Sequence, residues 1–244
     1  MKRRPAIVLL GLAAAVLMGC GGNSQRHDGT ISSAVNVVGA MKDAMWKGEI
    51  GGKIDLDTIA EKSHLYGLGP VEYFSGELLI IDGRSYRSTV LSDSAMAVEA
   101  TYKARAPFFV YANVGEWVNR PLPDSVQTLG QLESFLDRTT AHRRRPFAFR
   151  LTGTVESAVI HVMNLPAGTD VRTPEAAHQG ERLYRLTGEK CEIVGFFSTE
   201  HKGIFTHHDS FVHAHLITAD RTKMGHLNEL HFRPGSLSLS LPAD

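Results

Sequence analysis

Cysteine, net charge and long apolar segments are all scarce in this sequence. Its 26 basic and 26 acidic residues cancel, so there is no electrostatic basis for binding nucleic acid or a bare lipid surface. One run, residues 6–18, is strongly apolar, and it is too short for a stable transmembrane helix. With 244 residues and no internal repeats, the chain can bury a substantial core as one large domain or two small ones.

The first twenty residues, 1–20, predict a bacterial lipoprotein signal peptide. A basic start, Lys2-Arg3-Arg4, precedes the apolar run, which ends in Leu17-Met-Gly-Cys20. This ending resembles a lipobox, in which the cysteine becomes the lipidated first residue of the mature protein. Residues 21–30 have the composition of a flexible tether. We therefore expect an extracytoplasmic protein whose contact with a bacterial membrane is a lipid anchor on Cys20.

The residues around the two cysteines complete this prediction. Gly21 follows Cys20 in place of an acidic retention signal, which favours the outer membrane where the host has one. Ordinary signal cleavage near Ala13-Ala-Ala15 is the alternative. If Cys20 carries lipid, Cys191 is left alone and no intramolecular disulfide can form. Cys191 precedes an apolar strand and has no base beside it in sequence, so we expect a buried structural thiol.

Hydrophobic periodicity predicts an α+β fold that is dominated by strands. Apolar residues at helical spacing indicate helices over residues 31–46, 55–62 and 121–137. Asp82-Gly83 between two alternating segments predicts a β-hairpin. The other expected strands are 97–104, 107–113, 147–152, 156–163, 182–187, 191–198, 210–218, 226–233 and 236–241. We expect two β-sheet-based halves with a few helices, over residues 31–145 and 146–244, the second carrying the candidate metal site.

Three histidines near the C-terminus form the most informative pattern. His213 and His215 stand at positions i and i+2 of an expected strand, so their imidazoles project from the same face. A polar loop follows, and a return strand starting near Gly225 would bring His226 beside His215. Three neutral imidazoles around an open fourth position are a common way to hold a catalytic divalent metal, with Zn²⁺ as the first choice.

Two alternatives to this triplet remain open at the level of sequence. The chain has twelve histidines, and an H-x-H on a strand is often a pair of partly exposed polar residues. His207 or His208 could also act as a ligand, although adjacent strand residues face opposite ways and only one of them could join. The combination of His213, His215 and His226 is the geometrically better set.

Several segments resemble the acetolactate decarboxylase family. They are Glu192-Ile-Val-Gly-Phe-Phe197, the H-x-H itself, Asp220-Arg221, Gly225-His226, Tyr66-Gly-Leu-Gly69 and Gly76-Glu-Leu-Leu-Ile-Ile-Asp-Gly83. They follow the order and spacing of that family, and the resemblance extends from Ile31 to Leu241. It implies an α+β fold, decarboxylation of 2-acetolactate to acetoin, and a homodimer. It also implies that the three histidines are metal ligands and that Glu77 is an acidic residue beside the metal.

The sequence departs from the family pattern at three points. Pro70 stands where the family has a threonine, and His161 where it has an arginine. The family also has a C-terminal tail with a further glutamate, and this sequence ends at Asp244, so we expect a site without that carboxylate. An arginine binds a carboxylate in a bidentate manner, whereas an imidazole offers one donor and carries charge only below about pH 6.5. Altered substrate contacts are therefore expected.

These residues support a concrete chemistry. A divalent cation can take up the negative charge that remains after CO₂ leaves a β-keto acid, and a positioned acid must then deliver a proton. Glu77 is the candidate acid, with a surface position on an edge strand as the alternative. His161 is the candidate substrate contact, with a polar residue on the wet face of a strand as the alternative.

Three functions therefore compete. They are a membrane-tethered decarboxylase, a catalytically inactive binder of a metal and a small oxo- or hydroxy-acid, and a metal-sequestering lipoprotein that also uses His201, His207 and His208.

Overall fold

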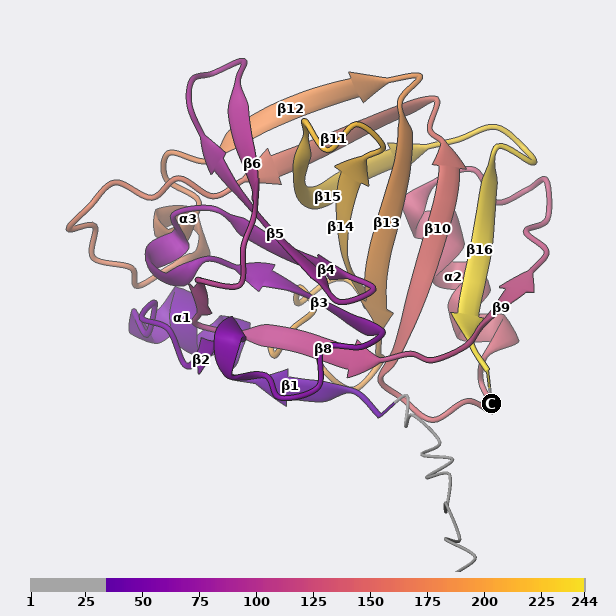
Figure 1. Cartoon of the computed structure of the whole chain (residues 1–244), viewed down its shortest axis with the longest axis horizontal. Helices are drawn as coiled ribbons and strands as arrows, with labels where there is room; N and C mark the ends of the chain where they lie inside the picture. Colours follow the sequence, from indigo (N-terminus) through magenta and orange to yellow (C-terminus); the bar gives the residue numbers. More distant parts are fainter. Residues whose placement is uncertain (1–33, 244) are drawn as a thin grey trace, which may run out of the picture. The chain divides into compact units, whose positions relative to one another are not determined.

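The computed structural model describes residues 34–243, and the expected α+β fold is confirmed. Six strands form the first sheet in the order β1-β8-β3-β4-β5-β6, and eight form the second in the order β12-β11-β15-β14-β13-β10-β16-β9 (Figure 1). A separate two-stranded ribbon consists of β2 and β7. The signal peptide, the tether and the predicted lipidation site at Cys20 lie outside the described residues. Within the described part of the chain, no helix has the length and apolarity needed to span a membrane.

The elements have the following bounds. The helices are α1 Met41–Lys47, α2 Leu129–Thr139 and α3 Pro174–Ala177, with 3₁₀ turns η1 Leu56–Thr58 and η2 Glu72–Phe74. The strands before α2 are β1 Asn36–Val38, β2 Ile54–Asp55, β3 Leu65–Pro70, β4 Glu77–Ile81, β5 Arg84–Val90, β6 Met96–Ala100, β7 Arg105–Ala106, β8 Phe109–Asn113 and β9 Trp117–Arg120. The strands after it are β10 Phe147–Thr154, β11 Ser157–Val162, β12 Arg182–Thr187, β13 Lys190–Phe197, β14 Val212–Thr218, β15 Met224–His231 and β16 Leu237–Pro242.

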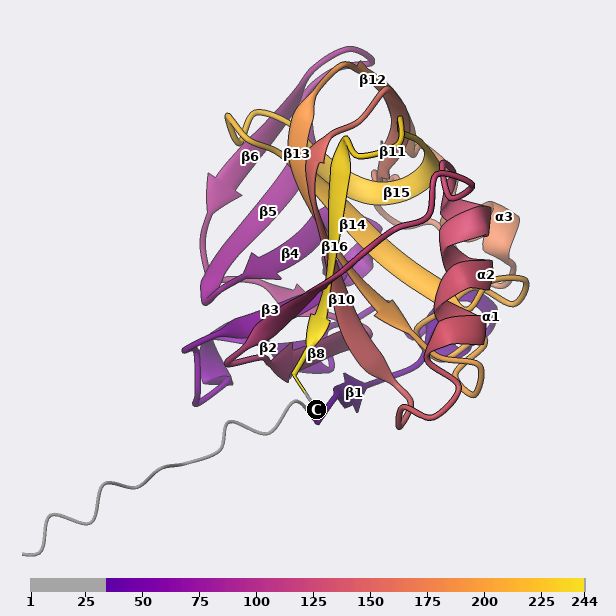
Figure 2. The same ribbon diagram turned by 90° about the vertical axis from the view of Figure 1, so that its right-hand side faces the viewer.

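The two large sheets pack face to face, as the rotated view shows (Figure 2). One buried cluster contains side chains of both sheets, including Leu68 and Leu79 from the first and Val194 and Ile217 from the second. A second cluster fills the other face of the eight-stranded sheet, where Leu132 and Leu136 of α2 cover it. The eight-stranded sheet also includes β9 from the part of the chain before residue 146. One face of β14 and β15 is therefore enclosed between the sheets.

The helix predicted over residues 31–46 is confirmed from Met41 onward and is wrong over the described residues before it. Residues 36–38 form β1 instead, with Val37 opposite Val110 of β8, and α1 begins only at Met41. Gly39 separates the two elements with φ +66°, and a Cβ there would lie 2.1 Å from the carbonyl oxygen of Pro107. Valine is β-branched and favours a strand. The apolar residues before and after Gly39 stand at helical spacing only by coincidence.

Two other helices are shorter than predicted. Over residues 55–62 only η1 forms, because the Asp55 side chain accepts a hydrogen bond from Asp57 N and closes a single turn. Helix α2 begins after Thr128, whose hydroxyl accepts a hydrogen bond from Gln131 N, and not at residue 121 as predicted. The hairpin at Asp82-Gly83 is confirmed, with both turn residues at positive φ as a tight two-residue turn requires. The predicted buried position of Cys191 is also confirmed, and burial raises the pKa of its thiol to about 12.

Candidate metal and acid site

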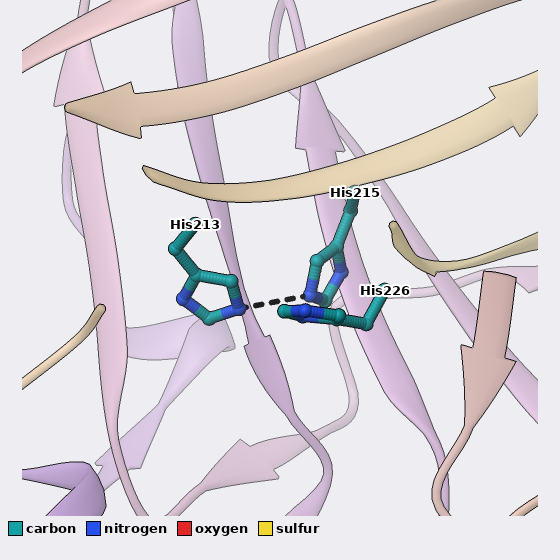
Figure 3. Close-up of side chains that lie close together, drawn as sticks. All are labelled: His213, His215 and His226. Carbon is teal, nitrogen blue, oxygen red and sulfur yellow. Dashed lines mark hydrogen bonds between the residues drawn. The ribbon is translucent and has the colours of Figure 1, made fainter. Parts of the chain in front are cut away.

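Three neighbouring strands of the larger sheet bring the histidines together. His213 and His215 lie on β14, and His215 is the register partner of His226 on β15. His226 is in turn the register partner of His161 on β11. Gly225 permits the close approach of these strands, because a Cβ there would lie 2.4 Å from the carbonyl oxygen of His161. The result is a row of imidazoles from His215 through His226 to His161 across the sheet. Figure 3 shows the rings of His213, His215 and His226 close together.

The spacing of the donor atoms of His213, His215 and His226 fits a small divalent cation. The Nε2 atoms of His213 and His215 are 3.2 Å apart, and each of the three rings can place a nitrogen within 4.8 Å of the others. Two nitrogens bound at about 2.0–2.1 Å to one tetrahedral zinc would be about 3.3 Å apart. All three residues are buried. The donor set therefore suits a three-histidine metal site with a fourth position for another ligand.

Burial keeps these histidines neutral. Desolvation, followed by the neighbouring imidazole of His161, lowers the pKa of His215 to about 3. Desolvation also lowers the pKa values of His213 and His226 well below the usual 6.5, and nearby histidines lower them further. A neutral imidazole keeps one nitrogen lone pair, which is the form that binds a metal. The site is therefore ready for a cation at neutral pH without first losing protons.

Glu77 reaches this site from the opposite sheet. It begins β4 and is only 2% exposed, so the alternative of a surface acid is excluded. Its Oε2 lies 3.7 Å from Nε2 of His215, and its Oε1 accepts a hydrogen bond of 3.3 Å from Met163 N. Desolvation raises the pKa of the Glu77 carboxyl well above its usual value. In the metal-free protein, burial thus favours the protonated form of the Glu77 carboxyl group.

His161 is buried and does not lie on a wet strand face. Its Nδ1 is 2.7 Å from Oδ1 of Asn228, so Nδ1–H donates and the lone pair belongs to Nε2. The register between β11 and β15 shifts between Val159 and Ile160, and Asn228 is the additional residue of this bulge. Desolvation lowers the pKa of His161 to about 4. At neutral pH the ring has no positive charge, and its Nε2 lies 3.8 Å from Oε1 of Glu77.

Two residues near this site, His178 and Glu181, escaped the sequence analysis. His178 follows α3, and its ring lies 5.6 Å from that of His161, while its Nδ1 is 2.6 Å from Oε2 of Glu181. No motif marks these two positions, because a segment distant in sequence brings them to the site. His207, considered above as an alternative ligand, places its ring 5.2 Å from that of His226. His208 is exposed, and His201 is hydrogen-bonded to the Ser198 hydroxyl.

A small cavity lies between Glu77 and the histidines of the site. Its volume is about 20 Å³, and among the described residues its lining includes no lysine or arginine. The polar part consists of Glu77 and five histidines, and the apolar part of Met41, Met45, Pro70, Phe74, Phe108 and Met163. A cavity of this size holds an ion or a water molecule. Pro70, one of the departures from the family pattern, lies at this wall.

Comparison with known proteins identifies the family. A family model described as alpha-acetolactate decarboxylase matches residues 39–243. The chain belongs to the alpha-acetolactate decarboxylase family. It is 22% identical over 201 residues to the alpha-acetolactate decarboxylase of Brevibacillus brevis, a match that covers 81% of this chain and 67% of that protein. The resemblance inferred from the sequence motifs is thereby confirmed.

Solved structures of the family share this fold. The acetolactate decarboxylase of Bacillus subtilis strain 168 superposes with a TM-score of 0.68 at 20% identity, covering 86% of each chain. That of Bacillus subtilis subspecies spizizenii gives a TM-score of 0.70 at 19% identity and the same coverage. Similarity at this level of identity shows the fold of the acetolactate decarboxylase family, and the chemistry of this member has to be argued from its own residues.

The buried histidines make a prediction about stability. Because the folded protein holds the pKa values of His161 and His215 at about 4 and about 3, protons bind first to the unfolded chain as the pH falls below 6.5. His161 and His215 should each lower the unfolding free energy by about 1.4 kcal/mol at about pH 5.5. The raised pKa of Glu77 acts in the opposite direction and offsets part of this loss.

Urea unfolding of the metal-free protein at a series of pH values measures this loss. We expect His161 and His215 together to lower the unfolding free energy by about 3 kcal/mol from about pH 7.5 to about pH 5.5, and the opposing contribution of Glu77 makes the net decrease smaller. His161→Gln should reduce the decrease by about 1.4 kcal/mol, and the exposed His208→Gln should leave it unchanged. If His161→Gln kept the full pH dependence of the wild type, the site would not exclude protons from His161.

Proposed function

We propose that this protein is a metal-dependent decarboxylase that converts 2-acetolactate to acetoin while tethered outside the cytoplasm. The observation that carries the proposal is the convergence of three buried histidines with a buried carboxyl group from the opposite sheet, whose pKa is raised by burial. Membership of the acetolactate decarboxylase family supports the same reaction and a small-molecule substrate.

The metal ligands in this proposal are His213, His215 and His226, with Zn²⁺ as the proposed ion. A bound divalent cation supplies Lewis acidity that stabilises the negative charge left on the substrate by the departure of CO₂. The histidines orient this cation toward the cavity, and burial between the sheets excludes water from the reacting groups.

Glu77 is the proposed proton donor. Loss of CO₂ breaks a carbon–carbon bond and leaves its electron pair on the remaining fragment, which becomes acetoin when it gains one proton. Glu77 carries that proton when its carboxyl group is neutral, and its Oε2 points toward the histidine cluster. The Met163 amide holds Oε1, which limits the rotation of the carboxyl group.

The tautomer of His161 determines what this side chain can bind. The lone pair on its Nε2 cannot bind a substrate carboxylate, whereas it can accept a proton or bind a cation. In the proposed decarboxylase, His161 lies beside Oε1 of Glu77 and His215 beside Oε2, so the two rings together orient the carboxyl group.

Substrate binding requires the cavity to widen. A volume of about 20 Å³ is far below the several hundred cubic ångströms of an ordinary small-molecule pocket. Met41 and Met45 of α1 form part of its wall, and unbranched methionine side chains change rotamer easily. We propose that the substrate enters by displacing these side chains.

An acetoin assay tests the proposed function. The purified protein, loaded with Zn²⁺ and mixed with 2-acetolactate, should release acetoin and CO₂ in equal amounts, and removal of the metal by a chelator should abolish the reaction. A protein with full metal occupancy that is stabilised by acetolactate but forms no acetoin would instead be the binding protein considered above.

The lipid anchor is a separate part of the proposal. Wild-type protein should partition with the membrane fraction, and Cys20→Ser should release it or leave it unprocessed, because serine offers no thiol for lipid attachment. Immunoblots of the soluble and membrane fractions measure the difference, with Cys191→Ser as a control that retains Cys20. An unchanged membrane fraction in Cys20→Ser would refute the anchor.

A further inference from the structure

A second group of metal-ligating side chains lies beside the three histidines. His161, His178 and Glu181 can each place a ligand atom within 4.8 Å of the other two. His161 belongs to β11, and the other two follow α3 in the connection to β12. His161 is buried, while His178 and Glu181 are about one quarter exposed. The group thus extends from the interior of the site toward solvent.

The orientations of the two imidazoles favour cation binding. Since Nδ1–H of His161 donates to Asn228, the lone pair of its Nε2 faces the cavity. Nδ1 of His178 lies 2.6 Å from Oε2 of Glu181, so a cation bound to both atoms would replace the proton that they share. Pairing with a carboxylate or amide oxygen on the far nitrogen is how metal-binding histidines are commonly held in one tautomer.

Glu77 lies between this group and the first one. Its Oε2 is 3.7 Å from Nε2 of His215, whereas its Oε1 is 3.8 Å from Nε2 of His161. The rings of His161 and His226 are stacked with their centroids 4.6 Å apart, so the two groups adjoin. The two oxygens of a single carboxylate can therefore serve both groups, as in two-metal sites with ions about 3.5–4 Å apart.

We propose that the protein has a second divalent-cation site formed by His161, His178 and Glu181, with Oε1 of Glu77 as the ligand shared with the first site. The absence of lysine and arginine from the described cavity lining supports it, because Glu77 has no resident cationic side chain there. Two imidazoles and two carboxylates form a donor set that suits Zn²⁺ or Mn²⁺. Because this site is partly open to solvent, it binds its ion more weakly than the first.

One consequence rests on the proposed function. An oxygen of Glu77 that binds a cation cannot hold a proton, so a filled second site blocks proton delivery by Glu77. Excess divalent cation should therefore inhibit acetoin formation after the first equivalent has activated it.

Metal counting tests the second site independently of any activity. The metal-free full chain is dialysed against increasing Zn²⁺, and zinc is measured by mass spectrometry. We expect two ions per wild-type chain, and one ion in His178→Ala and in the near-isosteric Glu181→Gln at the same free Zn²⁺. The exposed His208→Ala should keep both. Retention of the first ion in each variant shows that the fold is intact.

A spectroscopic measurement tests whether the two ions are neighbours. Wild-type protein with two equivalents of Mn²⁺ should give the electron paramagnetic resonance spectrum of a coupled pair, and Glu181→Gln should give that of an isolated ion. One ion per wild-type chain at saturation, or a second ion that persists when both His178 and Glu181 are replaced, would overturn the proposal. Two coupled ions without acetoin production would uphold the site and refute only the decarboxylase.

Discussion

Replacing His213, His215 or His226 singly by alanine should remove most of the bound metal. Each variant loses one of three buried nitrogen donors, and the remaining two cannot hold an ion against water in an open site. We expect the affinity for Zn²⁺ to fall by at least about 10²-fold, since the binding free energy of such sites is shared among few ligands. Competition with a chromophoric zinc chelator measures the change.

The neighbouring histidines provide the control for this experiment. His208 is exposed, so His208→Ala should leave the zinc affinity unchanged. His207 lies at the cavity but outside the triplet, so His207→Ala should have a much smaller effect than any of the three substitutions. If His207→Ala removed the metal and His213→Ala did not, the assignment of the ligands would be wrong.

Glu77→Gln should retain the first metal ion and lose at least about 10²-fold in kcat, the usual contribution of a positioned acid. Glutamine has nearly the same shape as a protonated glutamic acid, and its oxygen can still accept the hydrogen bond from Met163 N. It cannot, however, transfer a proton. The loss should therefore appear in kcat, with KM little changed.

A matched carboxylate tests the specificity of this effect. Glu181→Gln removes a carboxylate next to the same cavity without touching the proposed proton donor, so its activity at one equivalent of Zn²⁺ should exceed that of Glu77→Gln. An activity of Glu77→Gln within a few-fold of wild type, with zinc content unchanged, would exclude Glu77 as the acid.

Local patterns in the sequence were sufficient for part of this site. The placement of His213 and His215 on one face follows from the two-residue period of a strand, and their pairing with His226 follows from a short loop. Both are properties of adjacent residues and one hairpin. By contrast, the helical spacing over residues 31–46 misled the prediction, because Gly39 and the pairing of Val37 with Val110 lie outside any local periodicity.

The packing of the two sheets decided the rest. The sequence by itself determined the family, the strand-rich fold and the histidine triplet, because these depend on short-range periodicity and on motif order. Only the tertiary structure places Glu77 in the interior beside His215 and pairs His161 with the bulge residue Asn228, which selects its tautomer. It also brings His178 and Glu181 to the site. Protonation states depend on the solvent and charges around a group, and in this protein those surroundings come from segments that are distant in the chain.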